Sequence, residues 1–257
     1  SADLRERQRK LFEKEAPAYL THIIWLDHWP SSPIEAVVLA NEVLDAMPVH
    51  KFKQTTDGLR EMSVAAPQQA YEWALTPPAE ALTDAVKALN VTFAPDYESE
   101  INLLLGPWLK SLSASLARGL VLFIDYGYTR KEYYHPERSM GTLMCHYQHR
   151  AHGDPFFYPG IQDITSFVDF TAVADAGDEA GFCVDGFVTQ AVFLMSCGVG
   201  DGLALVEGDC ERYAMAQAIK RLCLPNEMGE RFKVMALSKD LEADWLGFSL
   251  MNHLDFL

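Results

Sequence analysis

The sequence predicts an α/β fold with a mostly parallel sheet. Two apolar runs, AVVLAN at 36–41 and LVLFIDYG at 120–127, show no polar alternation, which is typical of parallel strands buried on both faces. Segments with helical periodicity alternate with strand-like segments along the chain, as in α/β proteins. At 257 residues, with 49% hydrophobic residues, the chain is long and apolar enough to bury the core of such a sheet.

The individual elements follow from local patterns. An opening helix is indicated by Leu4, Leu11 and Phe12 on one face, and Asp3 followed by Glu6 resembles a capping box. In the first half of the chain we expect a helix at 1–16, a strand at 22–26, the buried strand at 36–41, a hairpin over 49–65 around Asp57-Gly58, irregular chain at 66–80 and a helix at 79–90. A further helix at 99–119 should be kinked near Gly106-Pro107 and ended by Gly119. After it we expect the strand at 120–127, irregular chain at 128–165, a helix at 169–181, a strand at 181–190, helices at 191–199 and 203–224, and a strand at 231–239.

Polar residues gather where the two apolar strands end. The first strand ends in Asn41 and Glu42 with Asp45 shortly after, and the second ends in Asp125 and Tyr126. Ligands of open α/β sheets bind outside the carboxyl ends of the strands. A simpler interpretation, in which Asn41 and Asp45 only cap the following turn, does not explain why two strands end alike. We therefore expect a ligand site on this edge.

The composition excludes several functions. With 21 Lys+Arg against 36 Asp+Glu, the net charge of −15 argues against binding to nucleic acids or anionic membranes. Residues 161–211 contain no Lys or Arg, which indicates either a solvated acidic surface or a docking site for a basic protein segment. No apolar run approaches the roughly 18 residues that cross a bilayer, so we expect no membrane insertion.

The cysteines and histidines do not indicate a metal centre. Five cysteines without a C-x-x-C motif favour buried thiols in a reducing compartment. His146, His149 and His152 have helical spacing, but the nearby Gly141, Gly153 and Pro155 make a helix doubtful, so hydrogen-bonding or substrate-covering loop histidines are favoured. No serine hydrolase, zinc protease or P-loop motif occurs.

The chain resembles one family in several places. ANEVLDAMPVHKF at 40–52 is similar to the signature of the MidA family of S-adenosylmethionine-dependent methyltransferases, whose mitochondrial members are complex I assembly factors that methylate an arginine. Further segments match in the same order over nearly the whole chain, namely SADLRERQRKL, GLVLFIDYGY, GTLMCHYQHRAHGDPFFYPGIQDITSFVDF, TQAVFLMSCGV and MGERFKVM.

The resemblance implies a class I methyltransferase (Rossmann-like) fold with strand order 3-2-1-4-5-7-6. The strand at 22–26 would be strand 3 and that at 36–41 strand 4. Family members carry strands 1 and 2 and a glycine-rich loop before this point, and no G-x-G-x-x-G occurs here. We therefore expect 1–257 to be a fragment of a single methyltransferase domain, without strands 1 and 2, with insertions at about 50–100 and 128–165, and unable to complete the cofactor pocket alone.

The resemblance also implies residue roles. We expect S-adenosylmethionine as cofactor and a protein substrate with a basic, arginine-bearing segment, while a homodimer is left open. Localisation would be the bacterial cytoplasm, or the mitochondrial matrix in a eukaryote. Alternatives are a non-catalytic assembly protein and a small-molecule methyltransferase. The expected residues are Asn41, Glu42 and Asp45 for catalysis, Trp25, Leu26 and Asn41 for the cofactor, and Asp125, Tyr126, His149, Asp163, Thr165 and Asp169 for the substrate.

Overall fold

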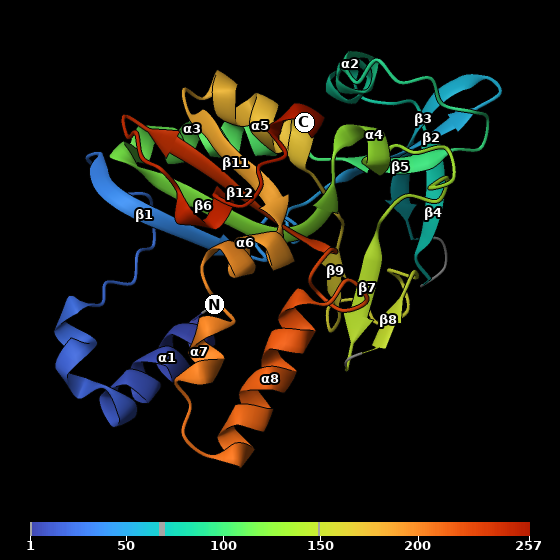
Figure 1. Cartoon of the computed structure of the whole chain (residues 1–257). Coiled ribbons are helices and arrows are strands. Elements are labelled where there is room, and N and C mark those ends of the chain that lie inside the picture. The colour runs from blue at the N-terminus through green and yellow to red at the C-terminus, as the bar shows by residue number, and fades with distance from the viewer. Residues whose placement is uncertain (1, 67–69, 149) are drawn as a thin grey trace.

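The computed structural model describes residues 2–66, 70–148 and 150–257, and its centre is a mixed sheet (Figure 1). Strand β1 (Ile34–Asn41) pairs in parallel with β6 (Leu116–Tyr128), and β12 (Phe232–Lys239) lies antiparallel between β6 and β11 (Cys183–Thr189). The order β1-β6-β12-β11 corresponds to strands 4-5-7-6 of the class I methyltransferase sheet. The predicted fold class is thus confirmed.

Helices cover both faces of this sheet. On one face α3 (Leu105–Ser115) and α5 (Phe170–Glu179) pack on Val121 and Phe123, both 0% exposed. On the other face α6 (Gln190–Ser196) and the 3-10 helix η3 (Leu246–Phe248) pack around Leu120, Leu122 and Ile124. The side chains of β6 therefore alternate between two apolar layers, which explains its unbroken apolar sequence.

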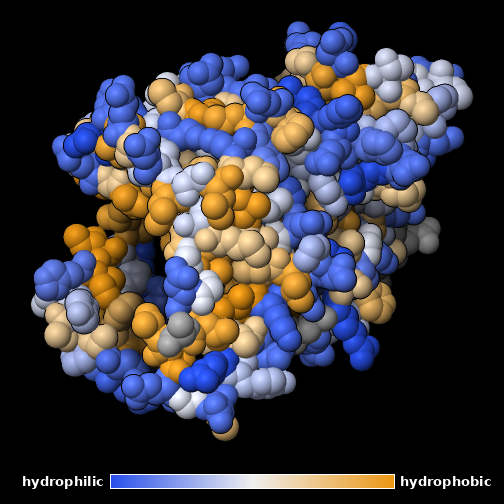
Figure 2. Space-filling model, in the orientation of Figure 1, coloured by the Kyte–Doolittle hydropathy of each residue, from blue (hydrophilic) through white to orange (hydrophobic). Residues whose placement is uncertain are grey.

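Strand β1 differs from this expectation because only one of its faces is covered. Ala40 is 5% exposed and packs with α3, whereas Val37 and Leu39 are 73% and 66% exposed. Figure 2 shows apolar side chains gathered on the part of the surface near β1 and the N-terminal segment. The prediction that this strand is buried on both faces is wrong for the described chain, in which β1 has one sheet neighbour.

The two expected insertions fold into separate antiparallel sheets. The first contains β2 (His50–Thr55), β3 (Gly58–Ala65), β4 (Glu72–Thr76) and β5 (Glu98–Ile101), in the order β4-β3-β2-β5, with α2 (Glu80–Ala88) packed beside it. The second contains β7 (Met144–Tyr147), β8 (Arg150–His152) and β9 (Asp163–Thr165), in the order β8-β7-β9. The short helix α4 (Arg130–Tyr133) contacts β6, and strand β10 (Val168–Asp169) pairs in parallel with the last two residues of β6.

The remaining helices lie to one side of the sheet in Figure 1. They are α1 (Ala2–Glu15), η1 (Pro17–His22), α7 (Asp201–Ala204) and α8 (Asp209–Cys223), while η4 (Leu254–Phe256) ends the chain. Helix α1 buries none of its residues, and Leu4 and Leu11 are exposed. Asp3 lies within its first turn and pairs with Arg7 at 3.2 Å, so the expected capping box is not formed.

Several local predictions are wrong. Residues 23–26 form no strand, and in the described chain they have no sheet partner that would hold them extended. Residues 72–76, expected to be irregular, form β4 because they pair with β3. The helix expected at 99–119 is β5 followed by α3, which ends at Ser115, and Gly119 lies inside β6. A Cβ on Gly119 would lie 2.0 Å from the carbonyl oxygen of Ala36, so this glycine permits the close contact with β1.

The cysteines agree only in part with the expected buried thiols. Cys145 and Cys223 are buried, whereas Cys183, Cys197 and Cys210 are exposed.

Candidate functional site

The turn after β1 is held in one conformation by the neighbouring strand. The Glu42 amide donates to the carbonyl of Ile124 at 2.9 Å, which extends the pairing of β1 and β6 by one residue. Glu42 has a φ of 51°, in the left-handed region that costs a non-glycine residue of the order of 1 kcal/mol. The chain therefore turns sharply at the end of the strand and brings Asp45 back over the end of β6.

Asp125 binds the backbone of this turn through its side chain. Its Oδ2 accepts hydrogen bonds from the amides of Leu44 at 3.0 Å and Asp45 at 3.2 Å, and its Oδ1 accepts from the Tyr126 amide at 2.9 Å. The side chain is 1% exposed, and burial, with the nearby Asp45 carboxylate, raises the pKa of Asp125 to about 7. Asp125 was expected to contact substrate, but the structure places it behind the turn.

Asp45 and Tyr126 form a hydrogen-bonded pair above Asp125. The Tyr126 hydroxyl donates to Asp45 Oδ2. Burial raises the pKa of the Tyr126 hydroxyl above its usual range, and its hydrogen bond to the Asp45 carboxylate raises it further. Asp45 is 4% exposed, and its Oδ1 is buried without a hydrogen-bond partner among the described residues. Such an unsatisfied carboxylate oxygen is costly, which marks it as a candidate for ligand contact.

Asp45 lines an open cavity of about 740 Å³ at the carboxyl end of β6. The cavity brings together five of the predicted residues, Glu42, Asp45, Tyr126, Asp163 and Thr165, from three separate parts of the chain. The three carboxylates give it an acidic character. Its walls also contain residues that the sequence did not single out for the site, including Met144, Gln162, Phe167, Arg231 and Phe232. They also contain His146, one of the loop histidines expected to form hydrogen bonds or to cover the substrate.

Part of this lining was within reach of sequence reasoning. A strand that runs antiparallel to β6 must begin at the edge where β6 ends, so the predicted strand order places Arg231 and Phe232 beside Tyr126. His146 and Gln162 lie in a stretch without periodicity, and only the folded three-stranded sheet brings them to the cavity.

Other predicted residues lie elsewhere. Asn41 is exposed and its amide donates to Glu42 Oε1 at 3.3 Å, but it does not line this cavity. Trp25 donates to Gln8 at 3.0 Å and lies beside α1, and Leu26 is 60% exposed. Neither lines the cavity that contains Asp45. His149 lies outside the described residues.

Asp169 lines a different cavity, of about 330 Å³, between the first insertion and helices α3 and α5. It caps α5 by accepting from the Ala172 amide at 3.1 Å, and it lies 3.5 Å from Arg130. Burial raises the pKa of Asp169 to about 6, although Arg130 acts in the opposite direction. These contacts explain Asp169 as a helix cap in a buried ion pair.

The described residues contain neither a metal-binding cluster nor a membrane-spanning helix. No group of three or more His, Cys, Asp or Glu side chains in the described chain is arranged to hold a metal ion. Among the described helices, none has both the length and the apolar character needed to cross a membrane.

The comparisons with known proteins agree with this geometry. A family model described as "Putative S-adenosyl-L-methionine-dependent methyltransferase" matches residues 1–188. Two crystal structures of superfamily members from Burkholderia thailandensis superpose with TM-scores of 0.94 and 0.92 at 40% and 39% identity, covering 100% of this chain and 69% and 67% of theirs. The second of these structures is bound to S-adenosyl-homocysteine.

Curated relatives are similar over a shorter part of their length. "Protein arginine methyltransferase NDUFAF7, mitochondrial" from Mus musculus is 32% identical over 215 residues, or 79% of this chain and 45% of the relative. The Homo sapiens protein of the same name is 30% identical over 210 residues, or 77% and 44%. The chain thus spans about 45% of the curated relatives it matches. By sequence and by fold, the chain belongs to the S-adenosylmethionine-dependent methyltransferase family.

Proposed function

We propose that the protein containing this chain transfers a methyl group from S-adenosylmethionine to an arginine side chain of a protein substrate. The observation that carries the proposal is Asp45, whose carboxylate is 4% exposed, holds an unpartnered Oδ1 and has no cationic partner among the described residues. A buried carboxylate is normally paired with a cation. A guanidinium has a fixed set of N–H donors and a permanent positive charge, and it would satisfy this site.

The other acids of the cavity support a cationic substrate. Glu42 and Asp163 line the same space, so a guanidinium entering it meets carboxylates from the turn after β1 and from β9. The cavity volume of about 740 Å³ is large enough for an extended side chain and part of its backbone. The relatives named as arginine methyltransferases, at about 30% identity, point to the same class of substrate.

The residues fit the reactive end of the cofactor. S-adenosylmethionine supplies an activated methyl group on a positively charged sulfonium, and the acceptor-only carboxylates of Glu42 and Asp45 are compatible with that charge. Glu42 lies at the carboxyl end of a parallel strand, where α/β proteins bind such cofactors. We therefore assign Asn41, the last residue of β1, and Glu42, which follows it, to the cofactor side of the site.

The chain's own groups would act on the acceptor. When the arginine nitrogen takes the methyl carbon, the carbon–sulfur bond breaks, the sulfonium becomes a neutral thioether and the nitrogen must lose a proton. Asp45 would orient the guanidinium through Oδ1, while Tyr126 holds its Oδ2. Glu42 or Asp45 would accept the proton and release it to water. Phe167 and Phe232 line the same cavity and would present apolar surface beside the acceptor.

Asp125 would act through the turn and not on the substrate. Because it binds the amides of both Leu44 and Asp45, it fixes the backbone that carries the Asp45 carboxylate. We propose Asp125 as a positioning residue, in place of the substrate-binding role expected from the sequence.

The test uses the full-length gene product with S-adenosylmethionine labelled on the methyl group and a set of arginine-bearing proteins. We expect label on arginine, and Glu42→Gln should lower the rate while leaving the fold intact. Label on a small molecule, or none with any acceptor while the cofactor still binds, would reject the arginine proposal. Unchanged turnover in Glu42→Gln would remove Glu42 from the mechanism.

Localisation follows the same reasoning. The free cysteines and the mitochondrial relatives favour a reducing compartment, which is the matrix if the source is eukaryotic and the cytoplasm if it is bacterial. Fractionation of cells that express the tagged full-length protein tests this assignment.

A further inference from the structure

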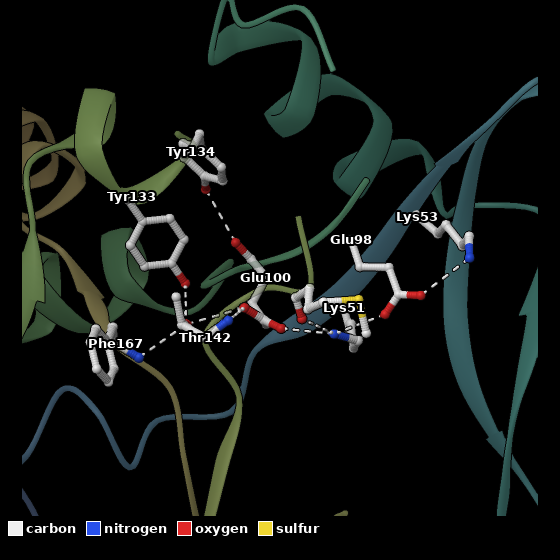
Figure 3. Close-up of polar contacts among 9 residues, drawn as sticks. Lys51, Lys53, Glu98, Glu100, Tyr133, Tyr134, Thr142 and Phe167 are labelled. Carbon is white, nitrogen blue, oxygen red and sulfur yellow. Dashed lines mark hydrogen bonds and ion pairs between the residues drawn. The ribbon is translucent and has the colours of Figure 1, made fainter. Parts of the chain in front are cut away.

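A buried polar network connects the first insertion to the wall of the acidic cavity (Figure 3). Its centre is Glu100 on β5, which is 0% exposed. Glu100 Oε1 accepts from Lys51 Nζ of β2 at 3.1 Å, and Lys51 is only 8% exposed and also donates to the Met140 carbonyl at 3.2 Å. A Cβ on Gly141 would lie 2.2 Å from Glu100 Oε1, so a glycine there lets the 140–142 segment approach the carboxylate.

Thr142 connects Glu100 of the inserted sheet to the segment that contains Phe167. Its amide donates to Glu100 Oε2 at 2.7 Å and its hydroxyl donates to the same oxygen at 3.1 Å. Because the single hydroxyl proton is used in that bond, the Thr142 oxygen acts as acceptor for the Phe167 amide at 3.1 Å and for the Tyr133 hydroxyl at 3.1 Å. The Glu100 carboxylate thus fixes the direction of the Thr142 lone pairs.

Phe167 carries the connection into the site. Its ring packs edge-on against Tyr126 with centroids 5.1 Å apart and stacks on Tyr128 at 5.4 Å. Phe167 and Tyr126 both line the cavity, and Tyr126 donates to Asp45. A chain of direct contacts therefore runs from Glu100 through Thr142, Phe167 and Tyr126 to Asp45.

We propose that Thr142, oriented by Glu100, is a positioning residue that sets Phe167 against Tyr126 and so shapes the wall against which the methyl acceptor binds. The acceptor part rests on the proposed function, whereas the placement of Phe167 does not. A purely structural ion pair needs only Lys51 and Glu100. The Thr142 bonds serve a different purpose. The two Thr142 donors join its segment to Glu100 in the inserted sheet, and the Phe167 amide on the Thr142 hydroxyl joins it to the segment before β10.

The deciding variant is Thr142→Val, which keeps the side-chain shape and removes the hydroxyl. Thr142→Ser restores the hydroxyl and is the rescue variant. Lys53→Met is the matched control, because Lys53 pairs with Glu98 in the same sheet at 3.3 Å but makes no contact with Thr142. If Thr142→Val does not fold by circular dichroism, Thr142→Ala replaces it.

Two readouts are measured on the full-length protein. We expect the Phe167 amide to exchange with deuterium at least about tenfold faster in Thr142→Val, which is the loss of about one hydrogen bond. The KM for the methyl acceptor should rise by about tenfold, with the KM for S-adenosylmethionine within about twofold. Thr142→Ser should resemble the unmodified protein in both.

The outcomes separate the two proposals. An unchanged Phe167 exchange rate in Thr142→Val, or equal acceleration in Lys53→Met, overturns the positioning role. Faster exchange of the Phe167 amide with an equal rise in both KM values also overturns it, because a general destabilisation of the fold would then be the cause. If the unmodified protein methylates no arginine, the proposed function fails, and the exchange rates alone decide whether Thr142 places Phe167.

Discussion

Two buried carboxylates in this molecule have opposite surroundings. Glu100 is 0% exposed and has Lys51 at 3.1 Å and two donors from Thr142, so both of its oxygens are bonded. Asp45 is 4% exposed, and its only side-chain partner among the described residues is the Tyr126 hydroxyl on Oδ2. The first carboxylate is paired with a cation within the fold, whereas the second lines a cavity and has one oxygen without a hydrogen-bond partner among the described residues.

The difference separates a structural acid from a functional one. Removing an ionised group from water is costly unless a partner replaces the solvent, so a buried carboxylate oxygen without a partner is a candidate for contact with a ligand. Burial alone does not make this distinction, because both residues are nearly inaccessible. The hydrogen-bond and ion-pair partners of the two carboxylates make the distinction, and they favour Asp45 over Glu100 as the group that binds a cationic substrate.

The largest effect is expected for Asp45→Asn. Loss of the charge should lower methyl transfer by roughly 100- to 1,000-fold, the range typical of a lost acid–base group. The same change removes an unpaired buried charge, so the free energy of unfolding should rise or stay the same. Turnover and urea denaturation are measured together, with Asp178→Asn as the control at an exposed position. A rate within about threefold of the unmodified enzyme would contradict the assignment.

Glu100 should respond in the opposite way when its cation is removed. Lys51→Met leaves the carboxylate without its cation, and we expect the free energy of unfolding to fall by about 3 kcal/mol. Lys53→Met is the comparison in the same strand, because Lys53 is 23% exposed against 8% for Lys51, so its loss should cost less than the loss of Lys51. Urea denaturation gives both values. Equal losses would show that the Lys51 pair is no more important than the Lys53 pair.

Sequence reasoning predicted the central sheet because its strands are long apolar runs. The four strands β1, β6, β11 and β12 were expected at nearly their observed positions. The short strands β4 and β5 were missed, because Glu72–Thr76 and Glu98–Ile101 become strands by pairing with β3 and β2 and carry little local signal. Residues 22–26 show the reverse case, since an apolar sequence without a partner strand stays irregular.

At the site, the turn residues were identified but the face of the sheet was not. Glu42, Asp45 and Tyr126 line one cavity as expected. Asp125 was placed beside Tyr126, yet consecutive strand residues point to opposite faces. Asp125 therefore follows Val121 and Phe123 into the layer under α3, where Leu44 also lies. Because both faces of β6 are apolar, the sequence showed no alternation from which to choose the face.

The pH dependence of Asp125→Asn tests whether this buried acid carries an unfavourable charge. Its pKa of about 7 in the fold lies above the ordinary value of 3.8, so the folded state favours the neutral acid. The stability that Asp125 contributes is then largest below about pH 4 and is lost as the pH rises through 7. Asparagine does not ionise, so the free energy of unfolding of the variant should increase relative to that of the unmodified protein as the pH rises from about 4 to about 7.

Urea titrations at several pH values between 4 and 8 measure this gain. Parallel stability curves for the two proteins would mean that Asp125 is stabilised as an anion by the three amides it binds. The variant should also lose about tenfold in turnover, since an asparagine has a single acceptor oxygen and cannot bind the Tyr126 amide with one atom and the amides of Leu44 and Asp45 with the other.

The smallest effect is expected at Asp169, whose side chain is 9% exposed beside Arg130. Asn is as good a helix cap as Asp, so Asp169→Asn should keep the bond to the Ala172 amide, and Arg130 keeps Asp175 at 2.7 Å. We expect a stability change below about 1 kcal/mol and unchanged methyl transfer. The sequence resemblance placed Asp169 with the substrate, so a fall in turnover of more than about tenfold would return it to the site. Such a result would also mean that the cavity of about 330 Å³ beside Arg130 communicates with the acceptor, since Phe167 lines both cavities.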